Sequence, residues 1–160
     1  MNVAYVNPFV QGAQNVLGTV CGTTPSLGQV HAKPKPYTPS TVCVSVAIVG
    51  DFHGEAVFNM DDTTACFAAS KMMGGMDVPA LDAMSQSALQ ELANMISGNV
   101  ATLFSGKGII VDIRPPIFHR DGKAADFPIS ENVPKIVCVP LNFPDGQVVA
   151  VDVLIPKEYQ

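Results

Sequence analysis

Glu91 and Asn94 are the side chains of this sequence best suited to chemistry. They lie three residues apart in the segment ALQELANMISGNVATLF, so in a helix they share one side. A carboxylate accepts hydrogen bonds or pairs with a lysine, whereas a carboxamide both donates and accepts, so it can hold a water in one orientation. Asn94 cannot act as a general base at neutral pH. The pair therefore predicts the positioning of a water molecule rather than acid–base catalysis.

A long amphipathic helix must present this pair, and we expect it over residues 81–104. On a helical wheel one arc is apolar and comprises Ala88, Leu89, Leu92, Met95, Ile96, Val100 and Leu103. The opposite arc comprises Gln86, Ser87, Gln90, Glu91, Asn94, Ser97 and Gly98. The polar arc is small and carries one charge, with room for close approach at Gly98. It is typical of a docking surface rather than of an ordinary solvated face.

The remaining elements predict an α+β fold. Asn7 and Pro8 suit a helix start, which gives a helix over residues 8–21, and Asp61 caps a second helix over residues 62–73. Strands are expected at 29–32, 42–49, 55–60, 109–113, 135–139 and 148–155. Arg114-Pro115-Pro116 should end the fourth of these strands. This order predicts helices packed on one face of a largely antiparallel sheet.

Composition limits the classes of function. The 160 residues fit one domain over 1–160, with 48% hydrophobic and only 14% charged residues. So little charge suggests that some apolar surface is buried in an oligomer. The net charge of −5 argues against a nucleic-acid partner. No apolar run has the roughly 18 residues of a membrane span, and the first residues lack a basic n-region, so we expect a cytoplasmic protein without membrane insertion.

No second reaction centre is evident in the sequence. There is no nucleophile elbow, no visible Ser–His–Asp or Cys–His arrangement and no glycine-rich phosphate loop. The cysteines are far apart, in apolar segments without a CxxC motif, which indicates buried thiols. The histidines lack an i,i+4 pair or an acidic partner, so we expect no metal site. These residues are Cys21, Cys43, Cys66, Cys138, His31, His53 and His119.

A longer motif contains the Glu–Asn pair. Ser87 is followed by three residues, Glu91, two residues, Asn94, twenty-one residues and Pro116. With these gaps the chain resembles the CheX branch of the CheC/CheX/FliY phosphatases of bacterial chemotaxis, whose first motif position is Asp or Ser. The neighbouring Met-Met-Gly-Gly-Met and Val-Asp-Ile-Arg-Pro-Pro segments, the Asn-Pro-Phe of the first helix and Gly28 add to the resemblance, which covers essentially the whole chain.

The resemblance implies a function and roles for residues. Such proteins speed hydrolysis of the aspartyl phosphate of the response regulator CheY. Asn94 would orient the attacking water and Glu91 would contact a lysine of the regulator. The phosphoryl group and a magnesium ion would belong to the regulator, so this chain would bind no cofactor. Ser87 and Pro116 would support the shape of the site, and we add Gly98 as a point of close approach.

The resemblance also implies a homodimer in which the sheet continues from one copy to the other. Two other functions stay open at this point. The chain could be a non-catalytic binding module, of the flagellar-switch type or for a response regulator. It could also be a phosphatase for a regulator outside chemotaxis.

Overall fold

The computed structural model describes residues 3–155 of the chain. The helices in this range are α1 (Val3–Cys21), α2 (Asp62–Met72) and α3 (Ala83–Ser105). The strands are β1 (Ser26–Leu27), β2 (His31–Lys33), β3 (Val42–Gly50), β4 (Gly54–Met60), β5 (Val111–Ile113), β6 (Ile117–Arg120), β7 (Ile136–Asn142) and β8 (Val148–Leu154). Two 3₁₀ turns, Ala124–Asp126 and Pro128–Glu131, lie between β6 and β7.

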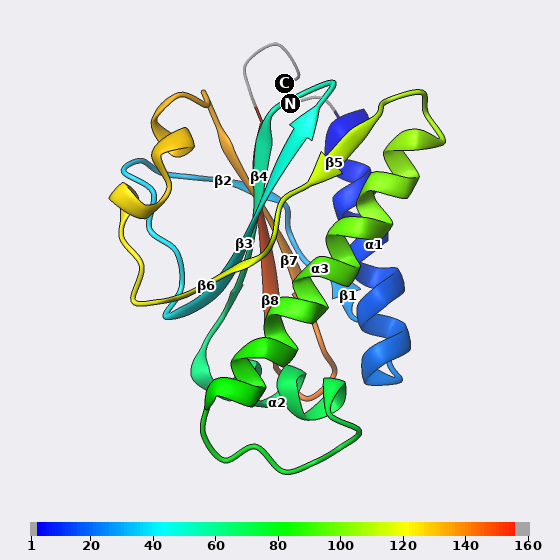
Figure 1. Cartoon of the computed structure of the whole chain (residues 1–160), viewed down its shortest axis with the longest axis vertical. Coiled ribbons are helices and arrows are strands. Elements are labelled where there is room, and N and C mark those ends of the chain that lie inside the picture. Colours follow the sequence, from blue (N-terminus) through cyan, green and yellow to red (C-terminus); the bar gives the residue numbers. More distant parts are fainter. Residues whose placement is uncertain (1–2, 156–160) are drawn as a thin grey trace.

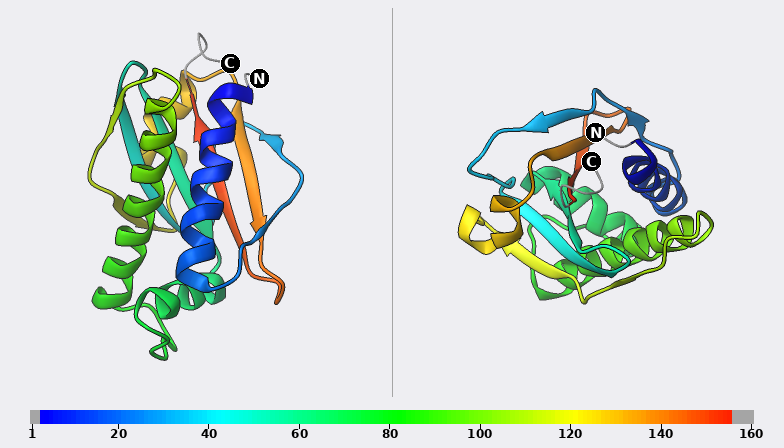
Figure 2. Two further views of the ribbon diagram at one scale, coloured as in Figure 1. Left: turned by 90° about the vertical axis from the view of Figure 1, so that its right-hand side faces the viewer. Right: turned by 90° about the horizontal axis from the view of Figure 1, so that it is seen from above.

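The described strands form one eight-stranded sheet in the order β1-β7-β8-β4-β3-β5, to which β2 adds on β7 and β6 on β3 (Figure 1). Every pairing is antiparallel. Helices α1 and α3 lie side by side on one face of the sheet (Figure 2). The segment that holds the 3₁₀ turns lies on the other side (Figure 2). The arrangement confirms the predicted α+β class, with helices on one face of an antiparallel sheet.

The long strands β3, β4, β7 and β8 bury residues on both of their faces, in two separate clusters. On β3, Val44 and Val46 belong to the large core between the sheet and the helices. Cys43, on the alternate face, belongs to a smaller cluster with Tyr37 and Phe127. Successive side chains of a strand point to opposite faces, which accounts for this division. The near-continuous apolar run of β3 therefore fits a strand covered on both sides.

Polar groups pin the connector between α1 and β3 to the second face. One oxygen of Asp152, a fully buried residue of β8, accepts from Lys33 Nζ at 2.6 Å, Tyr37 Oη at 2.6 Å and Asn59 Nδ2 at 2.8 Å. Burial, with the Asp152 carboxylate nearby, raises the pKa of Tyr37, so its hydroxyl remains a donor. We call Lys33, Tyr37, Asn59 and Asp152 the Asp152 cluster.

Helix α3 is capped by a pair of residues at its start. Asp82 accepts from the Ser85 backbone amide at 2.9 Å, and Ser85 Oγ accepts from the Asp82 amide at 2.7 Å. This reciprocal arrangement satisfies two backbone amides that a helix start otherwise leaves unpaired. The helix therefore begins at Ala83 rather than at the predicted residue 81, and it ends at Ser105, one residue beyond the predicted end.

The predicted apolar arc of α3 is correct for its centre and wrong at its margins. Leu89, Leu92, Ile96 and Val100 are buried as predicted. Met95, however, is 38% exposed, and Ser97 is only 3% exposed, so each lies on the side opposite to the one predicted. The reason is that α3 packs on α1 as well as on the sheet. At Gly12 of α1 an added Cβ would lie 2.7 Å from Val100 Cγ2, which shows how closely the helices approach.

Helix α1 spans Val3–Cys21, so Pro8, the predicted first residue, lies inside it. Tertiary packing overrides the proline signal, because the turns before Pro8 contribute to the core. Val6 is 6% exposed, and the Tyr5 ring lies 5.6 Å from that of Phe52. Such contacts offset the backbone hydrogen bond that a proline removes from a helix.

Other boundaries agree with the sequence to within a few residues. The β3–β4 hairpin and α2 occur where they are predicted, and Asp61 caps α2 by accepting from the Thr64 amide at 2.7 Å. Strand β7 runs further than predicted, through Pro140, whose carbonyl accepts from the Gly28 amide. The sequence does not predict the short strand β1, because two residues are too few to show the alternation of apolar and polar residues that marks a strand.

Candidate functional site

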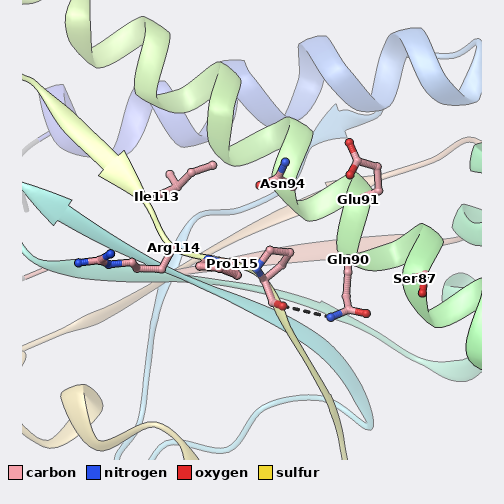
Figure 3. Close-up of a pocket in the computed structure, with 8 residues that line it drawn as sticks. Ser87, Gln90, Glu91, Asn94, Ile113, Arg114 and Pro115 are labelled. Atoms are coloured by element: carbon pink, nitrogen blue, oxygen red, sulfur yellow. Dashed lines mark hydrogen bonds between the residues drawn. The ribbon is translucent and has the colours of Figure 1, made fainter.

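A groove of about 560 Å³ lies between α3 and the segment that joins β5 to β6 (Figure 3). Its lining residues are Ser87, Gln90, Glu91 and Asn94 of α3 with Ile113, Arg114, Pro115 and Pro116 of the facing segment. Four of the five residues selected from the sequence, Ser87, Glu91, Asn94 and Pro116, thus meet in one place. We use "the groove" for this set of eight residues and "the strap" for residues 114–116.

Gly98 does not line the groove. It lies one turn beyond Asn94 on α3 and is half-exposed, and a Cβ added there would meet no atom within 4 Å. The fold therefore does not require glycine at this position. Its proposed part in a close approach depends on a partner molecule.

Helical geometry explains why three of these residues line the groove together. Ser87, Glu91 and Asn94 are spaced four and three residues apart, which puts them on one side of α3. Leu92 and Ile96, on the other side, are 3% and 1% exposed and hold the helix against the core. Figure 3 shows Glu91 and Asn94 projecting from successive turns. The buried side of the helix therefore fixes the direction of the side that carries Glu91 and Asn94.

The Asn94 carboxamide is accessible to solvent and is not buried beneath other side chains. Asn94 is half-exposed and Glu91 is exposed. Among residues 3–155, neither side chain has a hydrogen-bond or ion-pair partner. A carboxylate and a carboxamide that are held on a rigid helix and not used within the chain are available to another molecule.

The strap forms the second wall of the groove and is a bulge in the edge of the sheet. Strands β5 and β6 both pair with β3, Ile113 opposite Ile48 and Ile117 opposite Ser45. Ile117 is four residues after Ile113, but their partners on β3 are only three residues apart. One residue between Ile113 and Ile117 is therefore extra, which defines a bulge. The sequence correctly predicts an interruption at the prolines. It does not predict that pairing resumes as β6, because a proline signal marks a break and carries no information about the residues after it.

One hydrogen bond joins the two walls. Gln90 Nε2 on α3 donates to the backbone carbonyl of Pro116 at 3.1 Å, the contact marked in Figure 3. The sequence puts Gln90 on the polar arc without indicating a role for it, and Ile113, Arg114 and Pro115 are not among the predicted site residues. The signal for Gln90 is its position one turn before Asn94. Arg114 contributes the single positive charge of the groove.

Among residues 3–155, we identify no second cluster of titratable or nucleophilic groups that resembles a site. Burial raises the pKa of the Cys43 and Cys138 thiols to about 12, as expected of buried cysteines, and Cys66 is half-buried. All four cysteines are unpaired. Within residues 3–155, no group of three His, Cys, Asp or Glu side chains is placed to hold a metal ion.

One Ser–His contact exists that the sequence does not reveal. Ser45 Oγ and His119 Nε2 lie 2.8 Å apart, joining β3 to β6. Ser45 is only 5% exposed in the middle of a paired strand, so a substrate could not reach its hydroxyl without opening the sheet. The contact therefore satisfies a buried hydroxyl rather than activating a nucleophile.

The fold and the groove define a class of protein whose solved members share this sheet and its helices. The chemotaxis protein CheX from Desulfovibrio desulfuricans superposes with a TM-score of 0.77 at 22% identity, over 94% of this chain and 98% of that chain. A complex of CheX with CheY, BeF3 and Mg from Borrelia burgdorferi gives a TM-score of 0.79 at 29% identity. That match covers 96% of this chain and 98% of the other.

Sequence comparison identifies the family. Residues 42–139 match the family described as chemotaxis phosphatase CheX. The CheY-P phosphatase CheX of Thermotoga maritima is 29% identical over 136 residues, which are 84% of this chain and 88% of that protein. The chain therefore belongs to the CheX family, as its spaced motif predicts. None of the described helices is long and apolar enough to cross a membrane.

Proposed function

We propose that this chain is a phosphatase that accelerates hydrolysis of the aspartyl phosphate on a CheY-type response regulator. The observation that carries the proposal is the groove, which Glu91 and Asn94 line with no partner among the described residues. The relative from Thermotoga maritima is named as a phosphatase of CheY-P, and the Borrelia burgdorferi CheX was solved in complex with CheY. Both support the same substrate here.

In the proposed reaction Asn94 enters the active site of the regulator and holds a water through its carboxamide. The water oxygen forms a bond to phosphorus while the bond between phosphorus and the aspartyl oxygen breaks. Inorganic phosphate and the free carboxylate result, and a proton goes to solvent. Holding the water in line replaces a costly ordering step, and such positioning can raise a rate by orders of magnitude without acid–base chemistry.

Glu91 has a binding role in this proposal. Its exposed carboxylate would pair with a lysine of the regulator, and Ser87 and Pro116 would shape the groove around the contact. The magnesium ion would be carried by the regulator, so the chain itself would bind no cofactor. Its own residues would bind the regulator and orient the attacking water. The electrophile would come from the regulator.

The direct test measures the lifetime of a phosphorylated regulator from the same host with substoichiometric amounts of the purified protein. We expect the lifetime to shorten with multiple turnovers. Asn94→Ala should lose roughly 100-fold or more of the activity with an unchanged circular dichroism spectrum. Asn99→Ala is the control, because Asn99 is on the same helix but outside the groove, where its Oδ1 accepts from Asn15 Nδ2 at 3.3 Å. Full activity in Asn94→Ala would refute the mechanism.

The alternative functions give different results in the same assay. A non-catalytic binding module would bind stoichiometrically to a switch component or a regulator and leave the lifetime of the phosphate unchanged. A phosphatase from another pathway would act on a regulator outside chemotaxis. Testing the phosphorylated regulators of the host side by side separates these cases.

We also propose a homodimer, with the sheet continued between copies, that acts in the cytoplasm together with its regulator. The small share of charged residues, 14%, favours an assembly that buries apolar surface. Measuring the molecular mass in solution tests the dimer, because a monomer over the working concentration range would exclude it.

A further inference from the structure

We propose that Gln90 is a positioning residue. Its hydrogen bond keeps the strap close to α3, which fixes the width of the groove beside Asn94. The inference rests on the proposed phosphatase function. It adds a residue outside the spaced Ser–Glu–Asn–Pro motif.

The placement of Gln90 is the first argument. Gln90 and Asn94 are four residues apart, so their side chains lie one above the other on the same side of α3. The half-buried Gln90 donates through Nε2 to the Pro116 carbonyl at 3.1 Å. The bond therefore spans the groove one turn from the carboxamide that would meet the water (Figure 3).

The nature of the strap is the second argument. Pro115 and Pro116 lack backbone N–H groups, so this part of the edge cannot donate to a sheet ladder. The last ladder contact before the prolines is the Arg114 amide to the Ala47 carbonyl at 2.9 Å, and pairing resumes at Ile117. Between these points the strap is an inserted bulge with fewer backbone constraints. The Gln90 amide supplies a constraint that the prolines cannot supply.

The consequence is specific to the rate of the bound complex. Without this bond the strap can move away from α3, and the groove beside Asn94 widens. The Asn94 carboxamide then orients the attacking water less precisely. Binding depends more on Glu91 and on the exposed surface of α3, which do not require the bond. Losing Gln90 should therefore lower kcat and leave KM nearly unchanged.

The test uses Gln90→Met, which keeps the length of the side chain, and Gln90→Glu, which keeps its shape but replaces the donor by a charged acceptor. With one neutral hydrogen bond removed, we expect kcat to fall about threefold to tenfold in Gln90→Met. Gln90→Glu should fall at least as far at neutral pH, because a carboxylate repels the Pro116 carbonyl. KM should stay within about twofold for both variants.

Gln14 provides a matched control. Gln14 Nε2 of α1 donates to the Pro25 carbonyl, also at 3.1 Å and also partly buried, but outside the groove. Gln14→Met should therefore lower Tm by an amount similar to Gln90→Met while kcat stays within about twofold of the wild-type value. This pair of variants separates a loss of stability from a loss of positioning.

Three results would overturn the proposal: an unchanged kcat in Gln90→Met, a loss that lies wholly in KM, or an equal loss of kcat in Gln14→Met. Each is distinguishable from a failure of the proposed function. If the chain is not a phosphatase, the wild type is inactive and Asn94→Ala changes nothing. If only the positioning role is wrong, Asn94→Ala is inactive while Gln90→Met works normally.

Discussion

The groove and the Asp152 cluster are two polar regions among residues 3–155, and their side chains differ in how they are paired. In the Asp152 cluster, one buried carboxylate oxygen takes three donors within 2.8 Å. In the groove, Glu91 and Asn94 stand on a rigid helix, and neither has a side-chain partner among residues 3–155. Polar groups that hold a fold together are paired within it, because an unpaired buried charge is costly. Groups left unpaired at the surface cost nothing and remain available for a second molecule.

This comparison predicts that substitutions in the Asp152 cluster lower stability, whereas substitutions in the groove lower activity. Asp152→Ala has the largest expected effect. Removing the carboxylate leaves Lys33, Tyr37 and Asn59 without their shared acceptor. We expect a loss of about 3–5 kcal/mol in the free energy of unfolding, measured with urea. The kcat of the protein that remains folded should stay within about twofold.

Asp145→Ala is the control for that measurement, because Asp145 is exposed in the β7–β8 turn. It should change the free energy of unfolding by less than about 0.5 kcal/mol. A large drop in kcat for Asp152→Ala without a loss of stability would contradict the division between the two regions.

Glu91→Gln makes the opposite change, in the groove. The substitution removes a charge that has no partner among the described residues, so stability should change by less than about 0.5 kcal/mol. If Glu91 pairs with a lysine of the regulator, kcat/KM should fall about tenfold, mainly through KM.

Because the lost contact is a surface ion pair, the difference from the wild type should shrink as salt is added. Glu131→Gln, an exposed change on a 3₁₀ turn away from the groove, should have no such effect. A deficit in Glu91→Gln that does not depend on salt would rule out the ion pair.

Glu55 sharpens the comparison, because it is a polar residue that is largely buried and poorly paired. Its Oε1 atom has no hydrogen-bond partner among the described residues, and burial raises the pKa of this carboxyl to about 7. The folded state therefore keeps a proton that the unfolded chain loses near pH 4.3. Stability from this group is present at low pH and falls as the pH rises from about 4 through 7.

Glu55→Gln should abolish that fall. Relative to the wild type, the variant should gain about 1 kcal/mol at pH 8 and nothing at pH 4, after allowance for the partial exposure of the side chain. Urea denaturation across this range measures the difference. A constant difference between the two proteins at all pH values would show that ionisation of Glu55 is not the cause.

The sequence reveals the parts of the fold that depend on local patterns. The β-branched run of β3, the Asp61 cap of α2 and the spacing of Ser87, Glu91 and Asn94 all have short-range causes, and each is found where it is predicted. The groove is predicted only through its motif. No local sequence pattern predicts that Pro116, within a bulge, lies opposite Gln90.

The errors at Ser97 and Pro8 share one physical cause, which is tertiary packing that the sequence does not reveal. Ser97 is buried although it is polar, since α1 covers a second side of α3. Pro8 lies within a helix because Tyr5 and Val6 contact the core. A helical wheel assumes one buried side, and a proline rule assumes no tertiary contacts. Both assumptions fail where two helices share a sheet.

The strap has a consequence for the behaviour of the protein at high concentration. It lies on an outer strand of the sheet, where unpaired amides and carbonyls can recruit a strand from a neighbouring molecule. Pro115 and Pro116 offer no amide for such a contact, and the inserted residue breaks the regular spacing that an added strand would need. The feature that shapes one wall of the groove should therefore also protect this edge from aggregation.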